Sequence, residues 1–403
     1  MLAPPSRQPG DPPRQPPRRR LLQLACVAAL GGPVWARGPG STASGASPGK
    51  GDGPLVLGQS VPLTGPTAHL GRNYVQGAQL VFDQVNAAGG IGHRAIELRI
   101  QDDGYEADRC ADNTRRFIRE GVFALFGYVG TPTSLAAMPL ALEARVPFIA
   151  PRTGAQAVRE PLHSQVFVLR ASYREELSLI VARLRARGVS RVALLRQADS
   201  YGDAGLDGLT RALAAQGLGL LGQAGIERNS LDVSAAVRTL APLRPEAIVL
   251  VCTYQAAAAF IRAVRKTGFG GLFAAVSFVG TQDLIDSLGR EGAGVMISQV
   301  MPSPYNDVHP LAAQFRAAAR KAGGHVALTY SGIEGYLAGS VLVAGLQAAQ
   351  RVGRLSREGL VEGLESLGQR DIGGFPIELG PKRHVASNFV ELSTLVGDGS
   401  LRT

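Results

Sequence analysis

The chain contains few of the residues that build metal centres or disulfide frameworks. Its 403 residues include three cysteines, six histidines and a single tryptophan. No two histidines have the i, i+4 spacing of a helical metal site, and no Walker-type lysine loop is present, so we expect no metal and no cofactor. Cys110 lies on an early helical segment and Cys252 ends a strand-like run far along the chain, so we expect two separate thiols.

Two short motifs resemble enzyme signatures, but both lie in the wrong context. Residues 45–49 match the G-x-S-x-G pattern of a nucleophile elbow, which must lie between a strand and a helix. This copy lies in a Gly- and Ser-rich stretch. Residues 217–222 match a dinucleotide-binding fingerprint, which must follow a strand and open a helix, whereas here a helix precedes the motif and a strand follows it. We therefore predict that the protein is not an enzyme.

The composition favours a folded protein with a basic surface. The formal net charge is +10, and 45% of the residues are hydrophobic. The length suffices for two domains, each with its own core. Basic residues are scattered over helical segments and are not grouped with aromatic residues, so we expect a solvated basic surface and no nucleic-acid partner.

The first residues have the features of an export signal. Three arginines at 18–20 precede a short apolar stretch at 24–30, and small residues near Ala36 fit a cleavage site. We predict a signal peptide over residues 1–36, a flexible tether over residues 37–53 and a periplasmic mature protein. The paired arginines leave both the Sec and the twin-arginine routes open.

From residue 54 onward, strand-like apolar runs alternate with amphipathic helical segments, and the rhythm restarts near residue 175. A βαβα order requires a mostly parallel sheet with helices on both faces, so two such units predict an α/β fold with two Rossmann-like lobes. Strands are expected at 55–60, 95–101, 122–128, 146–150, 191–196, 218–226, 247–252 and 272–276. Helices are expected at 73–88, 107–120, 133–144, 175–187, 203–216, 233–241, 256–267, 310–322, 330–351 and 357–367.

The last three helical segments come too late in the chain to belong to the second sheet. We therefore expect the chain to return to the first lobe near residues 301–304 and to cross between the lobes three times, at 169–173, 298–303 and 374–379. The expected N-terminal lobe comprises residues 54–170 and 303–376, and the expected C-terminal lobe comprises 171–302 and 377–403. Several crossings form a hinge beside a cleft.

Polar or glycine-rich segments follow several of these strands, at the edge where open α/β sheets bind ligands. Thr64-Gly65-Pro66, Asn86–Ile91, Asp102-Asp103 and Ser200-Tyr201-Gly202 follow one another in order. As a set, over about residues 54–398, they resemble the branched-chain amino acid (Leu/Ile/Val) binding proteins, which are type I periplasmic binding proteins of ABC importers.

The resemblance implies two lobes that close around a small-molecule ligand about a three-crossing hinge, an ABC permease as membrane partner and no catalysis. It places Leu70 where the family carries a first-loop aromatic residue. By resemblance, the loops of both lobes contribute eight ligand-binding residues: Gly130, Thr131, Arg152, Thr153, Gly154, Tyr201, Tyr254 and Ser277. The first five are implied at the ligand carboxylate.

Two positions depart from the family pattern. Ser277 replaces the acid that pairs with a ligand ammonium, and Arg152 adds a cation where the ligand carboxylate is held. A guanidinium can hold a carboxylate through two parallel hydrogen bonds. The ligand is thus an amino acid or an organic carboxylate, and we favour an anionic ligand without an amino group and expect no protein carboxylate facing it. Alternatively, Arg152 points to solvent or pairs with a surface acid, and Tyr201 and Tyr254 serve only in packing.

The sequence favours a monomeric transport receptor. A ligand-sensing regulatory protein with the same fold is the main alternative, and the export signal disfavours it. A hydrolase or oxidoreductase is disfavoured because no nucleophile and base occur in a recognisable arrangement.

Overall fold

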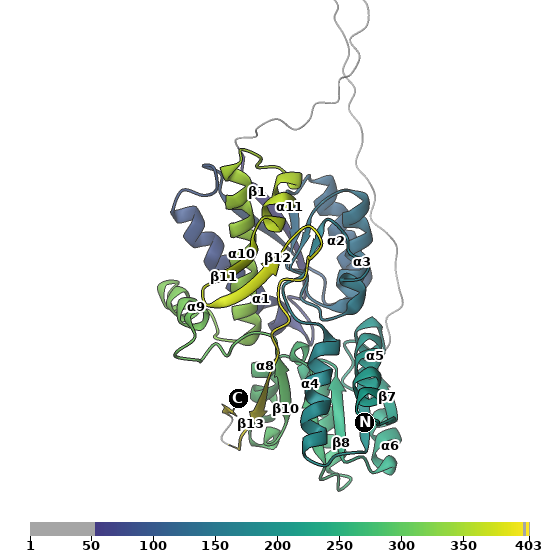
Figure 1. The fold of residues 1–403 in the computed structure, drawn as a ribbon. Coiled ribbons are helices and arrows are strands. Elements are labelled where there is room, and N and C mark those ends of the chain that lie inside the picture. Colours follow the sequence, from purple (N-terminus) through teal and green to yellow (C-terminus); the bar gives the residue numbers. More distant parts are fainter. Residues whose placement is uncertain (1–52, 398–399, 403) are drawn as a thin grey trace, which may run out of the picture. The chain divides into compact units, whose positions relative to one another are not determined.

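The computed structural model describes residues 53–397 and 400–402. The expected signal peptide and nearly all of the expected tether lie outside these residues. The described part contains two parallel-rich sheets and a small two-stranded sheet, with helices packed around them (Figure 1). This arrangement confirms the predicted α/β class.

The first sheet has five parallel strands in the order β2-β1-β3-β4-β5. Right-handed crossovers place the helix that follows the first strand on one face and the next two helices on the other face. The elements in chain order are β1 (Leu55–Val61), α1 (Ala68–Ala87), β2 (Ile96–Asp102), α2 (Ala107–Arg119), β3 (Ala124–Phe126), α3 (Thr131–Glu143), β4 (Phe148–Ile149) and β5 (Val166–Phe167).

The second sheet repeats this order as β7-β6-β8-β9-β10 and continues with two antiparallel strands, β13 and β14. Its central strand consists of the apolar residues 247–251, all fully buried, as expected of a parallel strand covered on both faces. The elements are α4 (Tyr173–Ala186), β6 (Val192–Gln197), α5 (Ser200–Ala215), β7 (Leu220–Ile226), α6 (Ser234–Leu240), β8 (Ala247–Val251), α7 (Tyr254–Arg265), β9 (Leu272–Ala275), α8 (Thr281–Leu288), β10 (Met296–Gln299), β13 (Glu391–Leu395) and β14 (Leu401–Arg402).

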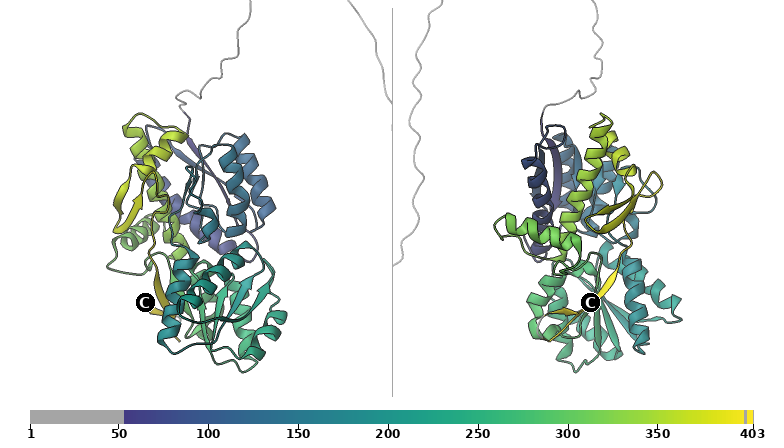
Figure 2. Two further views of the ribbon diagram at one scale, coloured as in Figure 1. Left: turned by 45° about the vertical axis from the view of Figure 1, so that its right-hand side comes forward. Right: turned by 60° about the vertical axis from the view of Figure 1, so that its left-hand side comes forward.

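Between β10 and β13 the chain returns to the first sheet (Figure 2). The returning elements are α9 (Pro310–Lys321), α10 (Tyr330–Arg351), α11 (Arg357–Glu365), β11 (Gly368–Ile372) and β12 (Phe375–Leu379). The expected return near residues 301–304 therefore falls in the segment that joins β10 to α9.

The third crossing lies later than the expected 374–379. Val385 forms a parallel bridge with Val168, at the end of β5, so residues 384–386 still belong to the edge of the first sheet. Glu391 already pairs with Gln299 of the second sheet. The strand β12 pairs with β11 and does not join the second sheet, so the boundary expected at residue 377 needs correction. We propose lobes of residues 54–168 with 310–386, and 173–299 with 391–402.

The helices α1 and α10 pack with their backbones in close approach, which positions α10 beside the site described below. A methyl group at Gly77 would lie 1.9 Å from the carbonyl oxygen of Gly332, and one at Gly335 would lie 2.1 Å from that of Tyr74. Neither contact leaves room for any side chain, so glycine is required at both positions.

Cys110 and Cys252 are both buried and free, as expected. Within the described residues, no helix combines the length and the apolar character needed to cross a membrane.

Candidate functional site

All eight expected site residues lie in loops or first helical turns that follow strands. Gly130 and Thr131 follow β3, while Arg152, Thr153 and Gly154 follow β4; Tyr201, Tyr254 and Ser277 follow β6, β8 and β9. All eight are buried. Because the strands of a parallel sheet end at the same edge, each sheet gathers its loops on one side.

The two threonines of the first lobe meet directly. The hydroxyl oxygens of Thr131 and Thr153 lie 2.7 Å apart, and the Thr153 oxygen also accepts a hydrogen bond of 3.1 Å from the Ala155 amide. The turns that follow β3 and β4 therefore contact each other through these two hydroxyls.

The glycines of these turns keep space for neighbouring rings. Gly130 has a φ of 113°, and a methyl group there would lie 2.3 Å from the Tyr105 ring. A methyl group at Gly154 would lie 2.4 Å from the Tyr173 ring. Both glycines thus allow an aromatic side chain to lie against the backbone at the site.

Arg152 points inward and is 2% exposed. Its Nε atom donates to Glu334 Oε2 at 3.1 Å, and its guanidinium lies over the Phe278 ring at 4.9 Å from the centroid. Its Nη1 atom has no hydrogen-bond partner within the described residues. Arg152 therefore neither points to solvent nor pairs with a surface acid, because its partner is a buried glutamate of α10.

A second arginine, Arg170, occupies the passage between β5 and α4. It donates to Ser277 Oγ, and its nitrogens lie 3.4 Å from Glu334 Oε1 and 3.5 Å from Glu176 Oε1. Glu176 Oε2 accepts from the Ser277 amide at 2.7 Å. Two carboxylates therefore lie beside the position of Ser277 and Arg152, so the expectation that no protein carboxylate faces the site is wrong.

The same oxygen of Glu176 also accepts from the Ser298 hydroxyl at 2.6 Å. Burial lowers the pKa of Arg170, but attraction by Glu334 and Glu176 outweighs burial and raises that pKa above its ordinary value. The four side chains Arg152, Arg170, Glu176 and Glu334 thus form a buried network in which two positive and two negative charges balance.

A third buried arginine, Arg159, binds the backbone of the segments that carry Arg152 and Arg170. It donates only to backbone carbonyls, at Thr153, Ala155, Arg170 and Ala171. Burial, and then the nearby Arg170, lower the pKa of Arg159 to about 10, so it stays charged at neutral pH. The group of three arginines and two glutamates therefore carries one net positive charge (3 − 2 = +1).

Four aromatic rings adjoin the arginines. Tyr201 lies 5.3 Å from Tyr173 and 4.9 Å from Phe278, and Phe278 lies 6.2 Å from Tyr105, measured between ring centroids. Burial raises the pKa of Tyr201 well above its ordinary value, so its hydroxyl is a neutral donor. That hydroxyl has no hydrogen-bond partner within the described residues.

Tyr254 and Leu70 lie in a different contact. Tyr254 stacks on His69 with 6.1 Å between ring centroids, and His69 Nδ1 lies 3.1 Å from Asp283 Oδ1 of the second lobe. Leu70 is fully buried and lies directly beside Gly280, so it faces the second lobe without a ring. Tyr254 of the second lobe therefore contacts His69 of the first lobe.

A narrow cleft runs between residues of both lobes, and we refer to it as the central cleft. It is lined by Arg152, Ser277, Gln299, Val300, Met301, Tyr330 and Glu334. Two of the expected site residues, Arg152 and Ser277, are among them. Within the described residues, no group of three or more His, Cys, Asp or Glu side chains is placed to hold a metal ion.

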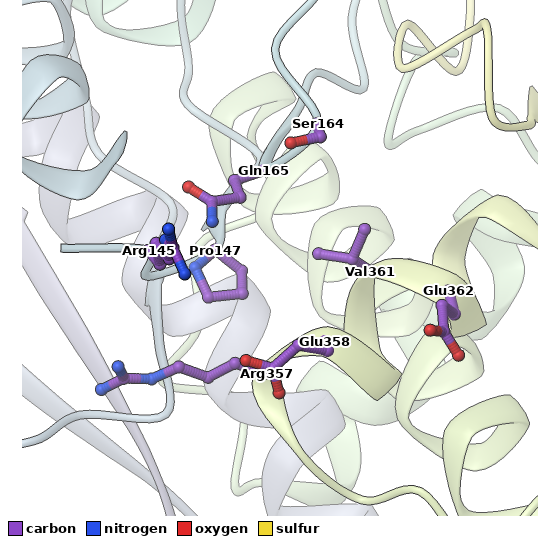
Figure 3. A pocket seen from close by; sticks show the side chains of 8 residues that line it. All are labelled: Arg145, Pro147, Ser164, Gln165, Arg357, Glu358, Val361 and Glu362. Atoms are coloured by element: carbon purple, nitrogen blue, oxygen red, sulfur yellow. The ribbon is translucent and has the colours of Figure 1, made fainter. Parts of the chain in front are cut away.

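A second depression lies at the opposite edge of the first sheet, where β4 and β5 begin (Figure 3). It is lined by Arg145, Pro147, Ser164, Gln165, Arg357, Glu358, Val361 and Glu362. Arg357 is already engaged, because it donates to the carbonyl oxygen of Val122. The central cleft is the stronger candidate, since its charged side chains are buried and residues of both lobes line it.

Sequence patterns do not single out Arg170, Glu176 or Glu334. One signal was nevertheless available, because Glu334 is the single acidic residue of α10, a helix whose residues are otherwise mostly apolar and buried. A lone buried carboxylate in such a helix needs a cationic partner. The sequence indicates a site role for Glu176 less clearly. Glu176 directly follows Glu175, which forms the capping box with Ser172 at the start of α4, so an acidic residue in this first turn is explained by helix capping.

Comparison with known proteins agrees with this fold. Residues 54–399 match the profile of a family described as periplasmic binding proteins. A solved structure of a possible leucine/isoleucine/valine-binding protein from Rhodopirellula baltica is 35% identical to this chain, with a TM-score of 0.83. That alignment covers 87% of this chain and 96% of the other.

Two further proteins extend the comparison. An "Amino acid binding protein" from Pseudomonas aeruginosa is 26% identical over 288 residues, which is 70% of this chain and 76% of the relative. A fatty acid ABC transporter substrate-binding protein from Thermomonospora curvata shares the fold at a TM-score of 0.79 and 23% identity, covering 88% of this chain and 92% of its own.

Proposed function

The chain belongs to the periplasmic binding protein family, and from this premise we propose that it is the periplasmic, monomeric solute receptor of an ABC importer. We propose further that its ligand is a carboxylate without an amino group and that the ligand binds in the central cleft. Gly130, Thr131, Arg152, Thr153 and Gly154 serve its carboxylate end, and Tyr201, Tyr254 and Ser277 face it from the second lobe.

The observation that carries this proposal is an excess of buried donors around the central cleft. Arg152 Nη1, Gln299 Nε2 and the Tyr201 hydroxyl have no acceptor among the described residues. A buried donor without a partner destabilises the folded state by about 1–3 kcal/mol. A ligand that supplies acceptor oxygens but no additional N–H donors relieves this cost, and a carboxylate is such a ligand.

The charges support the same ligand class. Glu334 and Glu176 are both within 3.5 Å of Arg170, so neither is free to pair with a ligand ammonium. Arg159 leaves the surrounding group with a net positive charge. The structural neighbour named for fatty acids is an example of a receptor on this fold for acids that lack an amino group.

A thermal-shift screen of the mature protein tests the proposal. Amino acids are compared with the carboxylates that lack only the amino group, such as leucine with 4-methylpentanoate and phenylalanine with 3-phenylpropanoate. A ligand at about 100 times its Kd adds roughly 2.7 kcal/mol of stability. We expect the carboxylates to raise the midpoint more than their amino acid counterparts. A larger shift with the amino acids would refute the proposed ligand class.

A further inference from the structure

Arg170 contacts Ser277 and Glu334, two residues that line the central cleft. A ligand cation at this place would lie in the position of the Arg170 guanidinium. Arg170 is 1% exposed and contacts Glu176, Glu334 and Ser277 at once. These contacts come from three separate segments, namely α4, α10 and the turn after β9. The guanidinium therefore already fills the position between the two carboxylates nearest to Ser277.

We propose that Arg170 is a specificity-determining residue, which excludes amino acid ligands by occupying the two carboxylates that a ligand ammonium would need. This inference rests on the proposed function and names the element that enforces it. Arg170 lies in the segment that joins β5 to α4, where the chain passes between the lobes. The residue that excludes an ammonium therefore comes from the hinge and not from a loop of the cleft.

Both charge and hydrogen bonding disfavour a ligand ammonium beside Ser277. Glu176 Oε2 already accepts from the Ser277 amide and the Ser298 hydroxyl, and its other oxygen faces Arg170. An ammonium that entered beside Ser277 would meet a buried guanidinium of the same sign. Like charges in a buried, water-poor site repel strongly, because the effective dielectric constant there is low.

The contacts also show why this exclusion does not depend on Ser277 alone. The serine hydroxyl accepts from Arg170, so one of its two lone pairs is already used by the guanidinium. A ligand without an amino group requires no acceptor at this place. The cleft can then offer the donors of Arg152 and Gln299 to the opposite end of the ligand.

A set of charge-neutralising variants tests this inference. Arg170→Gln removes the cation and leaves Glu176 and Glu334 with only Arg152, so the network of four gains one net negative charge. Glu176→Gln changes the same network by one charge in the opposite direction. The double variant R170Q/E176Q restores the neutral balance and serves as the matched control.

The readout is a selectivity ratio measured by calorimetry, defined as the Kd of leucine divided by the Kd of 4-methylpentanoate. We expect the ratio to fall by about tenfold or more in R170Q, which is the size of coupling seen between close charge pairs. It should rise in E176Q and stay near the wild-type value in the double variant. Circular dichroism verifies that each variant is folded.

The outcomes separate this inference from the proposed function. If wild type prefers leucine, the proposed ligand class is wrong. If wild type prefers 4-methylpentanoate but R170Q leaves the ratio unchanged, or weakens both ligands equally, then Arg170 has a structural or anchoring role and the inference is overturned. If R170Q does not fold, E176Q decides the matter, because an unchanged ratio in that variant also contradicts the inference.

Discussion

The two lobes touch in two kinds of places, the buried centre of the cleft and its exposed rim. In the centre, Arg152, Arg170, Glu176 and Glu334 are nearly without solvent contact. At the rim, Asn229 donates to the Gly104 carbonyl at 3.0 Å and to Glu106 Oε1 at 2.7 Å, and His69 contacts Asp283. His69 is 61% exposed at its side chain.

Buried and exposed contacts between the lobes differ in how much they contribute to stability. Removing one partner of a buried ion pair lowers the stability of the fold by several kcal/mol, because the other charge then stays buried without a partner. An exposed pair contributes about 0–1 kcal/mol and is screened by salt. We therefore expect the centre to set stability and specificity, and the rim to adjust affinity without changing selectivity.

The largest effect is expected for Glu334→Gln. This change removes the negative charge that pairs with Arg152 and leaves Arg170 with the charge of Glu176 alone, so the unfolding free energy should fall by about 3–5 kcal/mol. The same change removes a competitor for the Arg152 guanidinium, so the affinity for simple carboxylates should rise. Denaturant unfolding and calorimetry on one preparation measure both quantities. A variant that loses stability and carboxylate affinity together contradicts the assignment of Glu334 as a competitor.

Arg152→Ala is expected to come next. A buried ligand carboxylate would lose its charged partner, and we expect a loss of about 2–4 kcal/mol in binding, which corresponds to roughly thirty- to thousand-fold in Kd. Arg152→Lys is the matched control, because it keeps the charge but cannot donate two parallel bonds, and it should retain part of the affinity. Wild-type affinity in Arg152→Ala would remove the residue from the site.

At the rim, Asn229→Gly removes both interlobe hydrogen bonds and suits the backbone, since Asn229 has a φ of 59°. Each hydrogen bond contributes about 0.5–1.5 kcal/mol, so losing both should lower the affinity by about five- to 150-fold with selectivity unchanged. Asn229→Asp keeps the shape but faces Glu106 with a like charge, so it should bind no better than the glycine variant. A change in the leucine to 4-methylpentanoate ratio would show that the rim also selects the ligand.

Local features of the fold and of the site could be predicted from the sequence. The βαβα rhythm predicted the two sheets, because apolar periodicity is a local signal. The turns that follow strands indicated the positions of Thr131, Arg152 and Tyr201, since strand ends converge at one edge.

Partners across the fold could not be predicted in this way. The pairing of Arg152 with Glu334 joins residues 182 positions apart in sequence, and it depends on the close packing of α10 against α1. The third crossing was placed too early, because residues 384–386 pair with the edge of the first sheet through backbone hydrogen bonds that no side-chain pattern reveals.

The smallest effect is expected for His69→Ala, which removes the contact with Asp283. Because the histidine is mostly exposed, we expect Kd to rise only about two- to fivefold at low salt. The difference from wild type should shrink at about 0.5 M salt, where the Debye length is a few ångströms. The effect of Asn229→Gly should persist there, because its hydrogen bond to the Gly104 carbonyl involves no charge pair.

The pH dependence of this last variant sharpens the test. Burial raises the pKa of Asp283, and His69 partly offsets that rise. A carboxyl whose pKa is raised on closure binds a proton as the lobes close, so its contribution favours closure at low pH and is lost as the pH rises through the raised pKa. Without His69 the pKa of Asp283 rises further, so ligand affinity should fall more steeply with pH in His69→Ala than in wild type. Asp283→Asn should remove this component of the pH dependence. Parallel pH profiles for wild type and His69→Ala would show that closure does not bury Asp283 against His69.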